Sequence, residues 1–323
     1  MESVEKLLEE YSRELVGKGF SASTVEAYGL LNLGPFLKFL TQKGVVDLRR
    51  VGLDELLEYR LSVLEGKTSQ GRPYRHGTVA MRIRTVKRFF SWLEETGRIL
   101  LNPAGRLEEP RKLKKFPVTV LTEDEAERLL AIPDTSTTTG LREKAVLEVL
   151  YSTGIRLGEL LALLPEDVDF EGGVLRVNLG KGAKDRVVPL GDTASRFLKA
   201  YITQTRPYLA RKGGEIKNLF LSHLGTPLSG TLVERMVTHA ARRAGIERQV
   251  TPHTLRHTCA TLMVRRGAPI QAVSLLLGHT DLSSTQIYTH VAGADVKETH
   301  EASHPRERGA VVELAEAPAV AHV

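Results

Sequence analysis

A basic segment with two prolines constrains the fold of this chain more than any other feature of its sequence. Residues 108–118 combine these prolines with four basic side chains, at Pro110, Pro117, Arg111, Lys112, Lys114 and Lys115. Proline lacks a backbone N–H and like charges repel one another, so this composition is typical of an extended linker. We therefore expect two domains, at residues 1–107 and 121–307, joined by a basic linker at 108–120, as the length of 323 residues also favours.

The first domain carries apolar residues at helical spacing. Leu7, Leu8, Tyr11 and Leu15 begin this pattern, and it predicts helices over residues 4–17, 21–40, 53–64 and 76–95. Gly34-Pro35 lies inside the second of these helices and should kink or break it. The first domain is thus expected to be entirely helical.

The second domain is expected to be mixed. Alternating residues predict strands over 174–179 and 186–190, joined by a glycine- and lysine-rich turn. Helical patterns cover residues 122–131, 141–153, 157–163, 192–208, 229–244, 252–266, 269–277 and 283–291. We expect a mainly α chain with a small β-sheet, an α+β second domain, and a flexible tail over residues 308–323.

The positive charge of the chain lies in its first third. Residues 1–116 hold 21 Lys and Arg against 15 Asp and Glu, and this excess of six equals the net charge of +6. Six basic residues follow one another without an acidic residue between them: Arg72, Arg75, Arg82, Arg84, Lys87 and Arg88. A solvated helix face is one interpretation of this stretch, and a surface that faces DNA phosphates is the other.

Cysteine usage and the N-terminal residues bound the class of protein. The single cysteine, Cys259, excludes an internal disulfide. The start of the chain lacks the basic-then-apolar pattern of a signal peptide, and no apolar run reaches the length of a membrane span. We therefore expect a soluble cytoplasmic protein without membrane contact.

Several separate residues have the chemistry needed to cut a phosphodiester without a metal. Such a reaction needs a nucleophile, cations for the non-bridging oxygens and an acid for the leaving oxygen. Arg156 follows a glycine between two predicted helices, and His253 and Arg256 share one face at the start of another. Each is weak alone: His253 and His257 have the spacing of zinc ligands, and Tyr288 has the alternative of a core tyrosine.

In combination, these residues resemble the tyrosine recombinase family, also called the phage integrase family, and in particular its Xer-like bacterial members. The sequence motifs that match are TGIRLGEL, GKGAKDRVVPL, TPHTLRHTCAT, LLGH and YTHV, and the similarity extends over residues 4–306. One departure is the set Gly29, Gly34 and Pro35, which lies where relatives carry better helix formers. The resemblance implies an N-terminal helical core-binding (SAM-like) domain and a C-terminal tyrosine recombinase catalytic domain.

The resemblance also implies a catalytic set in the family's order: Arg156, Lys181, His253, Arg256, His279 and Tyr288. Tyr288 would attack and become joined to the 3′ phosphate, while the two arginines bind its oxygens. His253 would be the general base and Lys181 would protonate the 5′ oxygen, with His279 bonded to the phosphate. Glu159 would orient Arg156 or be a surface acid. No cofactor is implied.

The partner implied is double-stranded DNA that carries a specific recombination site. Lys184 and Arg186, beside the predicted hairpin turn, are expected to contact the DNA backbone. Family members act as tetramers on two sites, with each C-terminal segment docked on a neighbour, so a homo-tetramer or a hetero-tetramer with a sister recombinase is expected. The stretch after Tyr288, as far as Arg306, resembles that docking segment, and an ordinary terminal helix is the other interpretation. Two other functions stay open: a type IB-like topoisomerase and a non-catalytic DNA-binding accessory protein.

Overall fold

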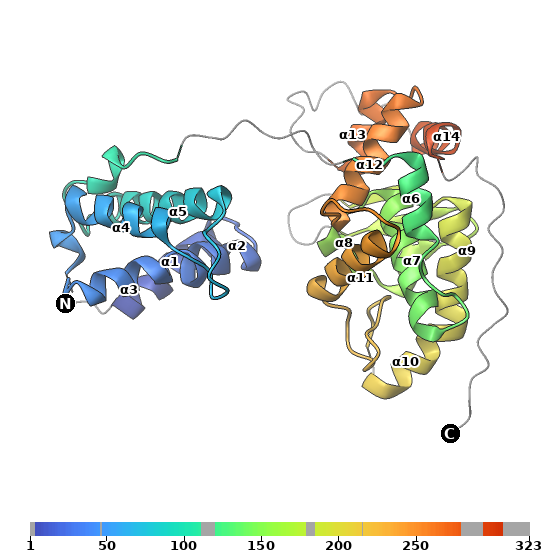
Figure 1. Cartoon of the computed structure of the whole chain (residues 1–323), viewed down its shortest axis with the longest axis horizontal. Coiled ribbons are helices and arrows are strands. Elements are labelled where there is room, and N and C mark those ends of the chain that lie inside the picture. The colour runs from blue at the N-terminus through green and yellow to red at the C-terminus, as the bar shows by residue number, and fades with distance from the viewer. Residues whose placement is uncertain are drawn as a thin grey trace. The chain divides into compact units, whose positions relative to one another are not determined.

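The computed structural model of the chain describes residues 4–45, 47–110, 120–178, 185–214, 216–278 and 293–305, without the side chains of residues 4, 5, 23, 293–296 and 298. The chain divides into two compact units, Met1–Phe116 and Pro117–Val323, and each is described by itself (Figure 1). It is mainly helical with one three-stranded sheet, which confirms the predicted fold class. No helix within these ranges has the length and apolar character needed to cross a bilayer.

Unit 1 is a bundle of helices, as the sequence predicts. Pro35 lies in the first turn of a helix that begins at Gly34, where a missing N–H costs no hydrogen bond, so the predicted break is confirmed. Its elements are α1 (Val4–Gly17), α2 (Ala22–Glu26), the π-helical turn η1 (Ala27–Leu31), α3 (Gly34–Gln42), the 3-10 turn η2 (Leu48–Arg50), α4 (Leu53–Glu65), α5 (His76–Glu95) and the 3-10 turn η3 (Pro103–Arg106).

Aromatic side chains fill the core of unit 1. Tyr11 on α1 meets Phe89 on α5 edge-on, with the ring centroids 5.3 Å apart. Phe36 on α3 meets Phe90 in the same way at 5.9 Å. Each such ring is fully buried, and its burial stabilises the unit by about 1.5–3 kcal/mol. Packing on the inner face of α5 therefore holds the bundle together.

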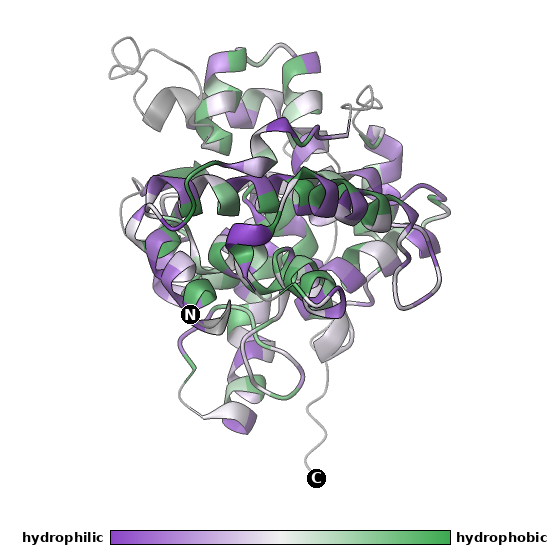
Figure 2. Cartoon of the chain, turned by 90° about the vertical axis from the view of Figure 1, so that its left-hand side faces the viewer, coloured by the Kyte–Doolittle hydropathy of each residue, from purple (hydrophilic) through white to green (hydrophobic). Residues whose placement is uncertain are grey.

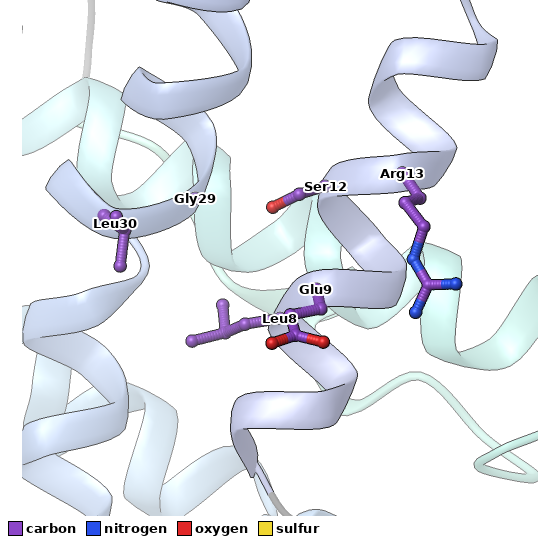
Figure 3. A pocket seen from close by; sticks show the side chains of 6 residues that line it. All are labelled: Leu8, Glu9, Ser12, Arg13, Gly29 and Leu30. Carbon is purple, nitrogen blue, oxygen red and sulfur yellow. The ribbon is translucent and has the colours of Figure 1, made fainter.

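A shallow hollow lies between α1 and η1 (Figure 3). A Cβ atom on Gly29 would lie 3.4 Å from Oγ of Ser12, which is close to an ordinary van der Waals contact. Leu30 remains 72% exposed beside the hollow. The hollow has a volume of about 520 Å³ and is lined by Leu8, Glu9, Ser12, Arg13, Gly29 and Leu30.

Unit 2 is built around one central helix, α7. All but one of the residues from Gly140 to Thr153 are buried, because α9, α12 and β3 pack around this helix. Its elements are α6 (Glu123–Leu130), α7 (Thr138–Thr153), α8 (Leu157–Ala162), the 3-10 turn η4 (Pro165–Asp167), β1 (Val168–Asp169), β2 (Val174–Val177), β3 (Arg186–Pro189), α9 (Asp192–Ala200), the π-helical turn η5 (Tyr201–Thr205), α10 (Arg206–Gly213), α11 (Gly230–Arg243), α12 (Pro252–Arg265), α13 (Ile270–Leu277) and α14 (Gly293–Ser303).

The three strands form an antiparallel sheet in the order β1-β2-β3. Leu175 pairs with Val188, and both side chains are buried, whereas Arg176 and its partner Val187 are exposed. This alternation confirms the two predicted strands. In Figure 2, hydrophobic and hydrophilic segments alternate along the helices in the same manner, as expected for elements with one buried face.

Three elements of unit 2 differ from the prediction. The helix predicted over 192–208 is interrupted by η5, and α10 restarts with Pro207 in its first turn, where proline needs no N–H partner. β1 has only two residues, too few to show an alternating pattern. α14 lies in the C-terminal stretch for which an ordinary terminal helix is one of two interpretations, given without bounds, whereas the helix predicted over 283–291 lies outside the described residues.

Candidate active site

Gly154 ends α7 and sets the position of Arg156. Its φ of 61° is left-handed, a conformation that glycine adopts without strain. A Cβ atom on Gly154 would also lie 2.9 Å from Cδ2 of Leu277, so a larger residue would require the side chain of Leu277 to shift. Two residues later, Arg156 has an extended backbone and begins α8 as its N-cap residue.

Glu159 holds Arg156 from within the first turn of α8. Its Oε2 accepts a hydrogen bond from the backbone amide of Arg156 at 2.8 Å, and its Oε1 accepts one from Nη1 of the same residue at 2.9 Å. Arg186 on β3 donates to both oxygens as well, from Nη1 at 2.9 Å and from Nη2 at 2.8 Å. Burial by itself would raise the pKa of Glu159, but these hydrogen bonds outweigh it and hold the pKa at about 2. The carboxylate is therefore ionised at neutral pH.

α12 carries His253 and Arg256 on one face of its first turns. Thr251 caps this helix with its hydroxyl, and Pro252 occupies the first position. This start confirms the helix boundary that the sequence predicts. It leaves His253 exposed and Arg256 buried, at 4% of its possible exposed area.

Arg256 bridges the ends of two helices. Its Nη1 donates to the carbonyl of Gly154 at 2.6 Å and its Nη2 to the carbonyl of Leu277 at 2.7 Å. Burial, together with the positive charge of Arg156, lowers the pKa of Arg256 to about 10. The guanidinium is still protonated at neutral pH, and an added anion would stabilise its charged form.

Arginines from three elements meet at the C-terminal end of α13. The last carbonyls of a helix have no partner within it and carry partial negative charge, which favours cations there. Together with Glu159, the three guanidinium groups leave a net charge of +2, which suits the oxygens of a phosphodiester. Three consecutive carbonyls each accept one hydrogen bond: Leu276 from Arg186 at 3.2 Å, Leu277 from Arg256 at 2.7 Å and Gly278 from Arg156 at 2.9 Å.

His253 forms a pair with His257 on the exposed side of α12. Their Nε2 atoms are 2.8 Å apart and their ring centroids 4.1 Å apart. Only one nitrogen of this hydrogen bond is the donor, so at least one ring has an unprotonated Nε2 that can accept a proton. Within the described ranges, no group of three or more His, Cys, Asp and Glu side chains is arranged to hold a metal ion.

Four of the predicted site residues lie outside the described residues: Lys181, Lys184, His279 and Tyr288. The described residues end at Asn178 and begin again at Asp185, on either side of the predicted hairpin turn. A later described range ends at Gly278, whose carbonyl accepts a hydrogen bond from Arg156. His279 is therefore the next residue after the helix end that the arginines hold.

The six basic residues predicted to face DNA on unit 1 form two groups. Arg72, Arg75 and Arg84 are exposed, and Arg84 is paired with Glu109 at 2.8 Å. The other three are half-buried and bound within the unit: Arg82 lies 4.2 Å from the ring centre of Tyr74, Arg88 lies 4.6 Å from that of Phe20, and Lys87 donates to the carbonyl of Leu107 at 2.8 Å.

The contacts of Arg186 were not anticipated from the sequence, which suggested a DNA contact for this residue. Its side chain is 13% exposed and is bound to Glu159 and to the carbonyl of Leu276. The sequence feature that could have predicted these contacts is the alternation of buried and exposed residues along β3, because residues two apart share one face of a strand. Arg186 shares its face with the buried Val188, and an arginine there must find acceptors inside the unit.

The chain resembles known recombinases along most of its length. The family model described as "Phage integrase family" matches residues 119–294. The tyrosine recombinase XerD of Listeria monocytogenes serotype 4b (strain F2365) is 36% identical over 294 residues, which cover 90% of this chain and 96% of that protein. The tyrosine recombinase XerC 2 of Ralstonia nicotianae (strain ATCC BAA-1114 / GMI1000) is 36% identical over 300 residues, or 93% of this chain and 86% of that protein.

Solved structures share the fold. A lambda integrase fragment in a dimer bound to a COC′ core site aligns with a TM-score of 0.63 and 19% identity, and covers 86% of this chain and 96% of that one. The Tn1549 transposon integrase in complex with circular intermediate DNA aligns with a TM-score of 0.60 and 22% identity. The alignment covers 85% of this chain and 92% of that one.

Proposed function

Because this chain belongs to the phage integrase family, we propose that it is a site-specific tyrosine recombinase that cuts and rejoins DNA through a 3′-phosphotyrosyl intermediate. The single observation that carries this proposal beyond the family is the convergence of Arg156 and Arg256 at one helix end. Both guanidinium groups keep N–H groups beyond those bound to carbonyls, and the cluster has excess positive charge. It is suited to one phosphodiester group.

In the proposed reaction, Arg156 and Arg256 bind the non-bridging oxygens of the scissile phosphate. The hydroxyl of Tyr288 attacks phosphorus, and its proton passes to His253, which lies exposed in the first turn of α12 beside His257. The P–O5′ bond breaks as the Tyr–O–P bond forms, and Lys181 protonates the 5′ oxygen. His279 bonds the phosphate. Rejoining is the reverse, with a DNA 5′ hydroxyl as the nucleophile, so the bond energy is kept.

The proposed substrate is duplex DNA with a specific recombination site. Arg72, Arg75, Arg82, Arg84, Lys87, Arg88 and Lys184 are the proposed phosphate contacts, of which three on unit 1 are exposed. The proposed place of action is the cytoplasm. Affinity should then fall steeply with salt.

Assembly as a tetramer on two sites belongs to the proposal. A lambda integrase tetramer bound to a Holliday junction has the same fold, with a TM-score of 0.61. Both homo-tetramers and hetero-tetramers with a sister recombinase are compatible with relatives named XerC and XerD. Native mass spectrometry of assembled complexes distinguishes the two, because a second protein changes the mass.

Trapping on DNA tests the proposed function. A nicked suicide substrate loses its short 5′-hydroxyl strand after cleavage, so the covalent adduct accumulates. Sequencing the trapped DNA should return one recurring site with a fixed cleavage position. Adducts at unrelated positions, with relaxation of supercoils but without exchange between two sites, would favour a topoisomerase. The absence of any adduct would favour an accessory DNA-binding protein.

A further inference from the structure

Each nitrogen of the Arg186 guanidinium group donates a hydrogen bond inside unit 2. Nη1 and Nη2 form a bidentate ion pair with Glu159, and Nε donates to the carbonyl of Leu276 at 3.2 Å. The side chain is 13% exposed, against 46% for Arg156. A bidentate, buried guanidinium is fixed more firmly than an exposed one. Arg186 is therefore an internal connection between β3, α8 and α13.

Arg186 shares the carboxylate of Glu159 with Arg156, and this sharing limits how strongly Glu159 attracts Arg156. Each oxygen of Glu159 accepts two bonds, one from Arg156 and one from Arg186. If Arg186 were neutral, Arg156 would be the main counter-ion of a buried carboxylate. Its guanidinium would then be drawn toward Glu159 and away from a bound phosphate. The net charge of the cluster would also fall from +2 to +1.

Gly278 shows how closely Arg186 is packed against the end of α13. A Cβ atom on Gly278 would lie 3.0 Å from both Cζ and Nε of Arg186. The backbone of Gly278 is left-handed, with φ at 63°, and it leads directly into His279. Arg186 thus contacts both the partner of one proposed catalytic residue and the backbone that precedes another.

We propose that Arg186 is a positioning residue of the cleavage reaction, which holds Glu159 and the end of α13 so that Arg156 can bind the scissile phosphate. This inference rests on the proposed function. It replaces the expectation that Arg186 contacts the DNA backbone. The two roles differ in what they affect, because a backbone contact contributes to DNA affinity, whereas a positioning residue contributes to the rate of cleavage.

The variant Arg186→Gln separates these roles, with Arg176→Gln as its matched control. Arg176 lies on the neighbouring strand β2 with an exposed side chain, so the control removes the same charge from the same sheet. We expect Arg186→Gln to lower the single-turnover cleavage rate by about 10- to 100-fold, and the control to leave it unchanged. The salt dependence of DNA binding should be unaltered, whereas a lost phosphate contact would lower the slope by about 1.

The pH profile adds a readout that a general loss of stability would not change. The charged groups around Glu159 in the described structure are Arg156 on α8, Arg186 on β3 and Arg256 on α12. Without Arg186, burial should raise the pKa of Glu159, so the carboxyl becomes neutral on acidification and releases Arg156. The defect of Arg186→Gln relative to the parent protein should therefore shrink as pH falls.

The double variant Glu159→Gln/Arg186→Gln completes the test. It removes the carboxylate that would otherwise draw Arg156 away from the phosphate, so it should cleave faster than Arg186→Gln alone and lose the added pH dependence. Equal rates for the parent and Arg186→Gln, or a defect confined to DNA affinity, would overturn the inference. If the parent protein itself formed no covalent adduct, the proposed function would fail instead, so the two failures are distinguishable.

Discussion

Arg156 and Arg256 come from different helices, yet their guanidinium groups donate to consecutive carbonyl oxygens at the end of α13. Arg156 is half-exposed and is held by Glu159. Arg256 is buried, and among the described residues it donates hydrogen bonds only to backbone carbonyls. Their positive charges repel each other, because Arg156 contributes to the lowered pKa of Arg256. A phosphate bound between them would relieve this repulsion.

Replacing Arg256 with lysine should separate charge from geometry. An ammonium group keeps the charge but cannot reach the carbonyls of Gly154 and Leu277 and a phosphate at once. We expect the cleavage rate to fall by about 100- to 1,000-fold, and the free energy of unfolding to fall by about 1–3 kcal/mol. Single-turnover cleavage and urea denaturation measure the two effects. A lysine variant with the parent rate would show that charge alone suffices.

Gly278→Ala should damage both stability and cleavage. The left-handed backbone disfavours alanine by about 1 kcal/mol, and the new methyl group would press on the guanidinium of Arg186. Gly267→Ala is the matched control, because Gly267 has φ at 91° with open space around it. The control should lose stability but keep its cleavage rate. Equal cleavage by both variants would show that the contact with Arg186 is unimportant.

Acid should remove the stability that Glu159 contributes. Its pKa is about 2 in the folded protein against an ordinary value of 4.5, so the unfolded chain binds the proton first as pH falls. The contribution, on the order of 3 kcal/mol, is complete above pH 4.5 and is lost between pH 4.5 and about 2. The difference in unfolding free energy between the parent and Glu159→Gln should shrink over this window. A constant difference would contradict the buried ion pair.

The C-terminal helix α14 should dock less firmly in acid. Nε2 of His300 lies 2.8 Å from the carbonyl of Ser152, and Nε2 of His304 lies 3.1 Å from that of Tyr151, with the two rings stacked at 4.6 Å. Burial lowers the pKa of His300 below its ordinary 6.5, so stability is present above pH 6.5 and decreases as pH falls below it. The protection factors of the α14 amides, which are corrected for the pH dependence of intrinsic exchange, should decrease below pH 6.5. Unchanged protection factors in that range would exclude this coupling.

The sequence predicts the helices of unit 1 and the β2–β3 strand pair because their periodic patterns are strong. The break at Gly34-Pro35 follows from the missing N–H of proline. In contrast, η5 and α14 carry no pattern that distinguishes them, since their position is set by packing on α7 and the neighbouring elements. Tertiary contacts override local signals in both cases.

For the site, the ordered motif residues point to Arg156 and Arg256, but the motif cannot give their acceptors. The connection of Arg186 to Glu159 joins residues that are 27 positions apart, and that of Arg186 to Leu276 joins residues 90 apart. Such pairs depend on how three elements pack. A charged residue on the buried face of a strand is the signal that sequence reasoning can use in other chains.

Peptide mapping of the adduct on a nicked suicide substrate tests most directly whether Tyr288 becomes covalently joined to DNA, as we propose. We expect one modified peptide, with Tyr288 bearing the 3′ phosphate, and we expect Tyr288→Phe to bind the same DNA with unchanged affinity but to form no adduct. An adduct on another residue, or strand joining by the phenylalanine variant, would contradict the proposal.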